Sequence, residues 1–268
     1  MTAAEILKEL KPLGSESYKR VMSNHGVREP FFGVKISDLQ KIRRRIKTDY
    51  QVALDLYETG NYDAMYLAGL IADDERMTRK DLNRWISKAS HRPLASSTVA
   101  WVAAGSRYGW HLALEWIDSR KPLTAEAGWA TLRNLVSIKN DAELDLAELK
   151  RLLERVAKTI HEAPDDVRSQ MNWFVIAVGS YVKSLTDAAV RIGNRIGPVT
   201  IDMGDTSCRV RSRPTTSRRS RSAARSERNA RVRSAEPPRR GNHSKRLPFC
   251  RALVPHAEEA VCRAWPRA

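Results

Sequence analysis

Residues 52–72 read Val52-Ala-Leu-Asp-Leu-Tyr-Glu-Thr-Gly-Asn-Tyr-Asp-Ala-Met-Tyr-Leu-Ala-Gly-Leu-Ile-Ala72. Apolar residues recur here at intervals of three and four, the spacing of one face of an α-helix. The Gly60-Asn61 pair interrupts this pattern and predicts a break between two helices. The stretch therefore predicts a pair of short helices joined by a tight turn.

The same helical pattern extends over the first 195 residues. Ser37 is placed to cap a helix with apolar residues at Leu39, Ile42 and Ile46. Short turns rich in Pro, Asn and Asp separate further helical segments, expected over residues 78–89, 96–117, 124–139, 145–161 and 165–192. Strand-like alternation is confined to a short segment at 198–203.

The number of helices decides between two all-α architectures. About eight to ten helices are expected, and several carry more apolar surface than one neighbour could cover. Stacked helix pairs bury such surfaces better than a four-helix bundle does. The sequence therefore predicts an all-α solenoid of HEAT-like type.

The charge of the chain is distributed unevenly. The 268 residues carry 47 Lys and Arg against 31 Asp and Glu, a net charge of +16. Residues 209–268 contain 17 basic and 4 acidic residues (+13), which leaves 30 against 27 (+3) for residues 1–208. We therefore expect a HEAT-like domain at 1–208 and a disordered Arg-rich tail at 209–268. A nucleic-acid-binding tail and a reading-frame shift in a GC-rich coding sequence both explain its composition.

Several classes of protein are excluded. Three cysteines (Cys208, Cys250 and Cys262) are too few for a disulfide framework, which favours a reducing compartment. No apolar run is long enough to cross a membrane, and the N-terminus lacks a signal-peptide stretch. We expect a cytoplasmic protein without a membrane partner. No phosphate-binding loop, Cys-x-x-Cys pair or His-Glu-x-x-His motif occurs in the body, so neither a cofactor nor a metal site is expected.

Tryptophan is the residue type that points to a site. Trp101 lies among small residues, Trp173 follows the polar Gln170 and Asn172, and Arg133 shares a helix with Trp129. We expect Trp101, Arg133 and Trp173 to face a common concave surface. Trp85 and Trp116 are expected to be core residues.

A resemblance accompanies these residues. The stretch from Phe32 to Ile42, Trp101, the Trp129–Arg133 helix and the segment from Asn172 to Ala177 resemble the AlkD-like DNA alkylation repair family over residues 1–208. The resemblance implies a C-shaped superhelix that binds DNA on its concave face. It also implies hydrolysis of the N-glycosidic bond of N3- or N7-alkylated purines. Trp101 and Trp173 then match two catalytic indoles, and Arg133 matches the catalytic arginine.

One position departs from the family pattern. The family has an Asp one helical turn after its first Trp, whereas this chain has Gly105. Loss of such a charge commonly costs about 3–5 kcal/mol of transition-state stabilisation. Glu115 and Asp118 lie two to three turns further along and are not expected to reach the same point. Gly105 therefore favours DNA binding over catalysis.

Basic residues complete the expected interface. Arg43, Arg44, Arg107, Lys139 and Lys183 are candidate phosphate contacts, although a run such as Arg43-Arg44-Arg45 is more often a solvated helix face. The expected partner is double-stranded DNA, alkylated or branched, and the expected state is a monomer. Two alternatives stay open: a catalytically silent protein that recognises DNA structure, and a HEAT-like scaffold for protein partners.

Overall fold

The computed structural model describes residues 1–201. The expected tail at 209–268, and the boundary that separates it from the body, lie outside the described residues. The described part contains twelve α-helices and no strand; a lone bridge joins Gly14 to Val34. The helices are α1 (Ala3–Leu13), α2 (Glu16–Asn24), α3 (Ile36–Ile46), α4 (Tyr50–Glu58), α5 (Tyr62–Ile71), α6 (Arg79–Lys88), α7 (Ala100–Gly105), α8 (Gly109–Trp116), α9 (Pro122–Ile138), α10 (Leu146–Thr159), α11 (Asp165–Tyr181) and α12 (Thr186–Ile196).

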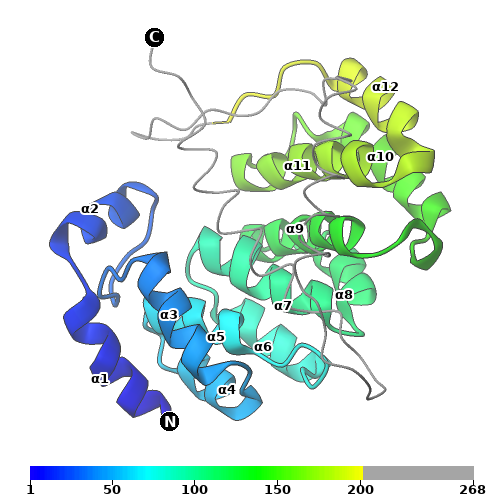
Figure 1. The fold of residues 1–268 in the computed structure, drawn as a ribbon. Helices are drawn as coiled ribbons and strands as arrows, with labels where there is room; N and C mark the ends of the chain where they lie inside the picture. The colour runs from blue at the N-terminus through cyan, green and yellow to red at the C-terminus, as the bar shows by residue number, and fades with distance from the viewer. Residues whose placement is uncertain (202–268) are drawn as a thin grey trace.

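The elements follow one another in an arc from α1 to α12 (Figure 1). A π-helical segment, η1 (Leu94–Val99), leads directly into α7. Successive contacts join α5 to η1, η1 and α7 to α9, and α9 to α11, which forms an inner layer. Against this layer pack α4, α6, α8, α10 and α12. The two-layered stack of helix pairs confirms the expected all-α, HEAT-like architecture.

Capping residues explain several helix boundaries. Asn61 caps α5 by accepting a hydrogen bond from the Ala64 N–H, so the predicted break at Gly60-Asn61 is confirmed. Thr78 begins α6 with a capping box to Asp81. The expected cap at Ser37 is wrong, because α3 begins at Ile36 after an extended Lys35. Ser37 therefore lies inside the first turn.

Two expected long helices are each divided. The segment 96–117 breaks after Gly105, where Ser106 is extended, and α8 begins at Gly109. A Cβ atom at Gly109 would lie 2.3 Å from the carbonyl oxygen of Ala103, so this tight corner requires glycine. The segment 165–192 breaks after Tyr181. Both breaks bring loop residues to the ends of inner helices.

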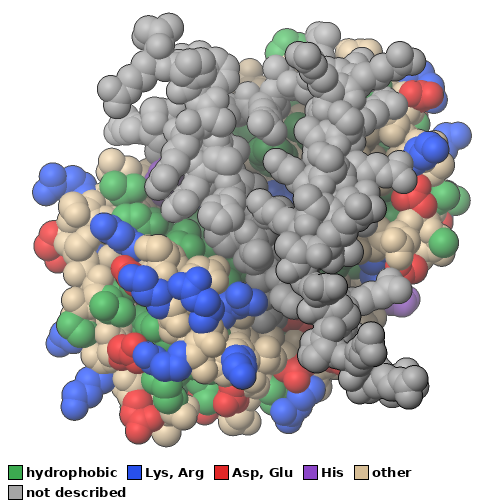
Figure 2. Space-filling view, viewed as in Figure 1, with side chains coloured by type: hydrophobic (Ala, Val, Ile, Leu, Met, Phe, Trp, Pro, Cys, Tyr) green, Lys and Arg blue, Asp and Glu red, His purple; other side chains and the backbone are tan. Residues whose placement is uncertain are grey.

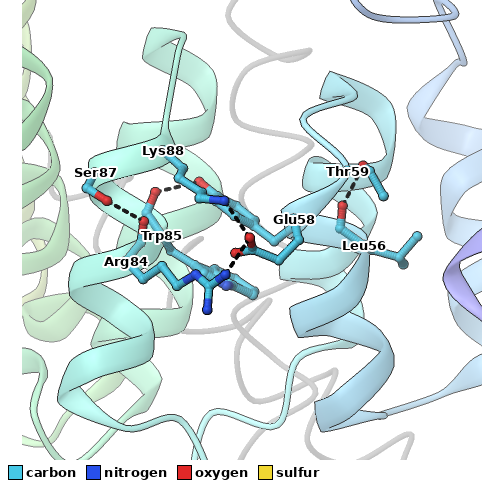
Figure 3. A network of polar contacts seen from close by, with 8 residues as sticks. Leu56, Glu58, Thr59, Arg84, Trp85, Ser87 and Lys88 are labelled. Atoms are coloured by element: carbon cyan, nitrogen blue, oxygen red, sulfur yellow. Dashed lines mark hydrogen bonds and ion pairs between the residues drawn. The ribbon is translucent and has the colours of Figure 1, made fainter.

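The N-terminal half of the core contains a stacked aromatic pair. The rings of Tyr57 and Trp85 lie 4.2 Å apart and nearly parallel, and the Tyr57 hydroxyl donates to the Trp85 carbonyl. Beside them, Glu58 accepts from Arg84 at 2.6 Å and also pairs with Lys88 (Figure 3). These contacts hold α4 against α6. Trp85 is 1% exposed and Trp116 3%, which confirms both as core residues.

Candidate nucleic-acid interface

The inner helices run in the same direction. The side chain of Arg92, just before η1, meets Glu126 near the start of α9 and Asp166 at the start of α11. At the opposite end, the Lys183 N–H after α11 donates to Asp141, which follows α9. Residues at the same distance from the start of each inner helix therefore lie side by side in the stack. This arrangement places Trp101, Arg133 and Trp173 on three neighbouring inner helices.

Trp101 lies in the core. Its indole is 4% exposed and meets the Tyr66 ring edge-on, with ring centroids 5.5 Å apart. The expectation that this ring lines an open groove is wrong, because the ring is buried and packs against Tyr66. Its buried Nε1–H has no hydrogen-bond partner in the described part of the chain. An unmet buried donor costs about 1–3 kcal/mol of stability.

Arg133 and Trp173 are more accessible. Both side chains are half-buried. Arg133 donates from Nη1 to Oε1 of Gln170 at 3.0 Å, which links α9 to α11. Gln170 precedes Trp173 by three residues, so both lie on one side of α11. Gln170 is buried although it is polar, and its bond to Arg133 explains how that burial is tolerated.

Gly105 ends α7 one turn after Trp101 and is half-buried. Of the two nearby acidic residues in sequence, Glu115 pairs with Arg79, and Asp118 pairs with Arg155 at 2.7 Å. Glu115 belongs to α8 of the outer layer, and Asp118 follows the end of that helix. Both carboxylates thus have partners away from Gly105, in agreement with the expectation that they do not replace the family Asp.

Comparison with known proteins identifies the family. The sequence profile of the DNA alkylation repair enzymes matches residues 6–212. The chain belongs to this family. The uncharacterized proteins Lin0241 of Listeria innocua and Lmo0209 of Listeria monocytogenes are each 28% identical to it, over 78% of this chain and 93% of theirs. A solved structure, described as a new family of proteins related to the HEAT-like repeat DNA glycosylases with affinity for branched DNA structures, is 31% identical. It covers 86% of this chain and 95% of its own, with a TM-score of 0.74.

In this alkylation repair family protein, four of the five basic candidates lie where inner helices end. Arg43 donates from Nε to the Leu70 carbonyl near the end of α5, at 3.3 Å. Arg107 follows the end of α7 by two residues, Lys139 caps α9, and Lys183 follows the end of α11 by two residues. We call these four residues the basic edge. They complement the negative ends of the helix dipoles.

The side chains of these basic residues differ in their surroundings. Arg107 and Lys183 are exposed, and Arg107 packs over the Tyr108 ring at 4.8 Å. Lys139 lies 3.8 Å from Glu143, and Arg43 is half-buried. Arg44 is exposed on α3, outside the basic edge. Figure 2 shows Lys and Arg side chains gathered over the part of the surface where α3 lies.

A buried acidic residue on α9 was not identified from the sequence. Glu126 is fully buried, and Arg92 approaches it with Nε 3.7 Å from Oε1, while the same Nε lies 2.8 Å from Oδ1 of Asp166. Burial raises the pKa of Glu126 to about 8, against the opposing effect of Arg92. Ser96 and Gln170 lie near enough to favour its charged form, yet neither carboxylate oxygen completes a hydrogen bond of ordinary geometry.

Glu126 connects to the predicted site through Gln170. On α9, Glu126 and Arg133 are seven residues apart and share a face, and Gln170 of α11 is near both. We call Arg92, Glu126, Arg133, Asp166 and Gln170 the polar seam. One sequence feature could have indicated the polar seam: a single acidic residue lies within the apolar first half of the expected 124–139 helix. The seam fixes the position of Arg133 relative to α11.

Within residues 1–201, no helix combines the length and apolar character needed to cross a bilayer. The same residues contain no group of three or more His, Cys, Asp or Glu placed to hold a metal ion.

Proposed function

We propose that this protein binds double-stranded DNA along the basic edge, and that branched DNA is its preferred form. The basic edge carries this proposal. Adjacent packed helices lie about 8–10 Å apart, so four successive ends extend over roughly 25–30 Å. Phosphates of one DNA strand repeat about every 3.4 Å along the axis. The edge therefore matches the length of a backbone segment of about eight nucleotides.

Similarity to one solved relative supports branched DNA as the preferred ligand. The solved protein that is 31% identical is described as having affinity for branched DNA, and the alignment with it spans most of both chains. The enclosed indole of Trp101 and the missing side chain at Gly105 also favour recognition of DNA shape over chemistry. Arg133 and Trp173 are half-buried on one side of the inner layer and are assigned to contact DNA next to the basic edge.

Hydrolysis of alkylated purine nucleotides is the second candidate function, favoured by membership of the alkylation repair family. The bond between C1′ and the base nitrogen would break with its electron pair going to the cationic purine, which leaves neutral. Positive charge would develop on the sugar, water would form the new C1′–O bond, and its proton would pass to solvent. Such a cationic leaving group requires little acid catalysis.

Binding measurements on the full chain test the first function. Anisotropy titrations would compare a plain duplex, a three-way junction and a duplex with an N7-alkylated guanine. Arg133→Ala and Trp173→Ala should weaken junction binding about tenfold or more. Arg191→Ala, an exposed change on α12, is the matched control. Removal of Lys183 should reduce the slope of log K against log salt by about one.

Two outcomes decide between the alternatives. Equal affinity of the chain and its Arg133→Ala variant for every DNA would contradict the assigned surface, and absence of DNA binding would favour the protein scaffold. Release of alkylated base above the spontaneous rate would establish the second function. DNA as the partner implies an intracellular protein; the cytoplasmic location and the monomeric state stay predictions.

A further inference from the structure

An exposed tyrosine occupies the last position of α11. Tyr181 is 47% exposed, and within residues 1–201 it is the only aromatic member of the exposed large apolar side chains. The other members, Met1, Leu13 and Val21, lie before or within α1 and α2, at the other end of the arc (Figure 1). Single exposed apolar side chains are common on proteins, so the surroundings of Tyr181 decide what the ring can do.

The backbone that carries this ring is held on the side towards Lys183. The next residue, Val182, is fully buried, and its N–H donates to the Val178 carbonyl at 3.0 Å. The Lys183 N–H donates to Oδ2 of Asp141 at 3.1 Å, which ties the end of α11 to the segment after α9. Tyr181 therefore presents its ring from a well-defined backbone, which reduces the entropy lost when a ligand packs against it.

Cationic side chains lie beside the aromatic rings of the basic edge. Lys183 is exposed two residues after Tyr181. The end of α7 repeats the pairing, since the guanidinium carbon of Arg107 lies 4.8 Å from the ring centre of the half-buried Tyr108. Two of the four members of the basic edge thus have an aromatic residue close to them in the chain. Surfaces that bind single-stranded nucleic acids combine cations and aromatic rings in this way.

An exposed ring distinguishes unpaired bases from paired ones. Within a duplex each base is stacked on both sides by its neighbours, whereas a base at a branch point or in an unpaired arm has a free face. An aromatic side chain stacks on such a face whichever base it belongs to, because every base has a π-face. Lys183 is the last member of the basic edge along the chain, so a strand that follows the edge reaches Tyr181 at its far end.

We propose that Tyr181 stacks on an unpaired base, and that the protein prefers branched DNA with a single-stranded arm. The inference rests on the proposed DNA binding and names the form of branched DNA that the basic edge takes. Lys183 contacts a phosphate beside the stacked base, and Arg107 with Tyr108 provides a similar pair at the end of α7. The preference is for DNA structure and not for sequence, since stacking tolerates every base.

The test compares two three-way junctions that differ in one arm. All arms of the first are paired, whereas one strand of the second is shortened to leave about eight nucleotides unpaired, the length that the basic edge spans. The full chain should bind the second junction about tenfold more tightly, measured by anisotropy as the ratio of the two Kd values. Tyr181→Leu keeps an apolar side chain without a ring and should bring the ratio close to one. Tyr181→Phe keeps the ring and should preserve the ratio.

A fluorescent base reports the stacking directly. The fluorescence of 2-aminopurine in the unpaired arm should be lower in complexes with the unmodified chain or Tyr181→Phe than in the complex with Tyr181→Leu. Leu13→Ala changes another exposed apolar side chain, on α1, and should leave both the ratio and the fluorescence unchanged. Urea unfolding of each variant checks that it is folded, as expected for changes at exposed positions.

The outcomes are distinguishable. Equal affinity of the unmodified chain for the two junctions would overturn the preference for an unpaired arm and leave DNA binding standing. A preference that survives Tyr181→Leu, or one that is lost in Tyr181→Phe as well, would overturn the stacking role of Tyr181. Failure to bind either junction would overturn the inference together with the proposed function.

Discussion

The Nη1 atom of Arg133 donates to Oε1 of Gln170 across the contact between α9 and α11, at 3.0 Å. This hydrogen bond holds the guanidinium in a set direction, which reduces the entropy lost on binding an anion. Gln170 is thus a positioning residue for Arg133 in the proposed interface. The polar seam extends this support to Glu126.

Gln170→Ala should weaken junction binding several-fold, because Arg133 would lose the hydrogen bond that links it to α11. In an Arg133→Ala background the same substitution should have little further effect, and this non-additivity is the signature of a shared interaction. Anisotropy titrations of the four proteins measure it. Gln51→Ala, at an exposed glutamine of α4, is the control. Independent effects of the two substitutions would contradict the positioning role.

Glu126 should make the protein less stable as pH rises. Burial raises its pKa in the fold to about 8 from its ordinary value of 4.5, so folding favours its neutral form. The stabilisation that neutral Glu126 provides is fully present below the pKa of the unfolded chain. It is lost as pH rises through the folded pKa, and the loss amounts to several kcal/mol. Urea unfolding at pH 5 and pH 8.5 measures the loss.

The Glu126→Gln variant isolates this contribution. It should reduce the difference in unfolding free energy between the two pH values, since a glutamine does not titrate. Glu16→Gln, an exposed change in α2, should leave the difference as it is. An unchanged pH profile in Glu126→Gln would show that Glu126 is charged in the folded protein.

Trp101 and Trp173 should respond differently to removal of the indole. Trp101→Ala should reduce the free energy of unfolding by about 3–5 kcal/mol, as expected for a buried aromatic residue packed against another ring. Trp173→Ala should cost less stability and mainly reduce DNA affinity. Denaturant unfolding and DNA titration of both variants test this contrast. Equal losses of stability would place both indoles in the core.

A Cβ atom built on Gly105, at the end of α7, would lie 2.2 Å from Oδ2 of Asp74, and this close approach should appear in the stability of the protein. Gly105→Ala should destabilise the unmodified chain by about 1–3 kcal/mol, because the new methyl group overlaps the carboxylate. In an Asp74→Gly background the same methyl group has room, and the cost should largely disappear. A thermal or urea double-mutant cycle measures the coupling, and additive effects would refute the close approach.

Local patterns predicted the helices well and the site less well. The break at Gly60-Asn61 could be predicted because Asn61 caps the next helix within three residues. The exposure of Trp101 was predicted wrongly, since small neighbours are compatible with an open groove and with close helix packing. Asp74 and Gly105 are 31 positions apart in the sequence, and no local pattern indicates that their atoms share one space. The same holds for the buried Glu126, whose partners come from two other helices.

A close contact between α5 and η1 in the inner layer has a mechanical consequence. A Cβ atom on Gly69 of α5 would lie 2.5 Å from Cγ2 of Thr98 in η1. A methyl group there would force α5 and η1 apart. The later inner helices α9 and α11 would tilt with η1, because they are stacked beyond this contact. A tilt of a few degrees at Gly69 would displace α11, three helix contacts further along, by roughly 1–2 Å. The absence of a methyl group at Gly69 therefore influences the angle between α5 and the later inner helices.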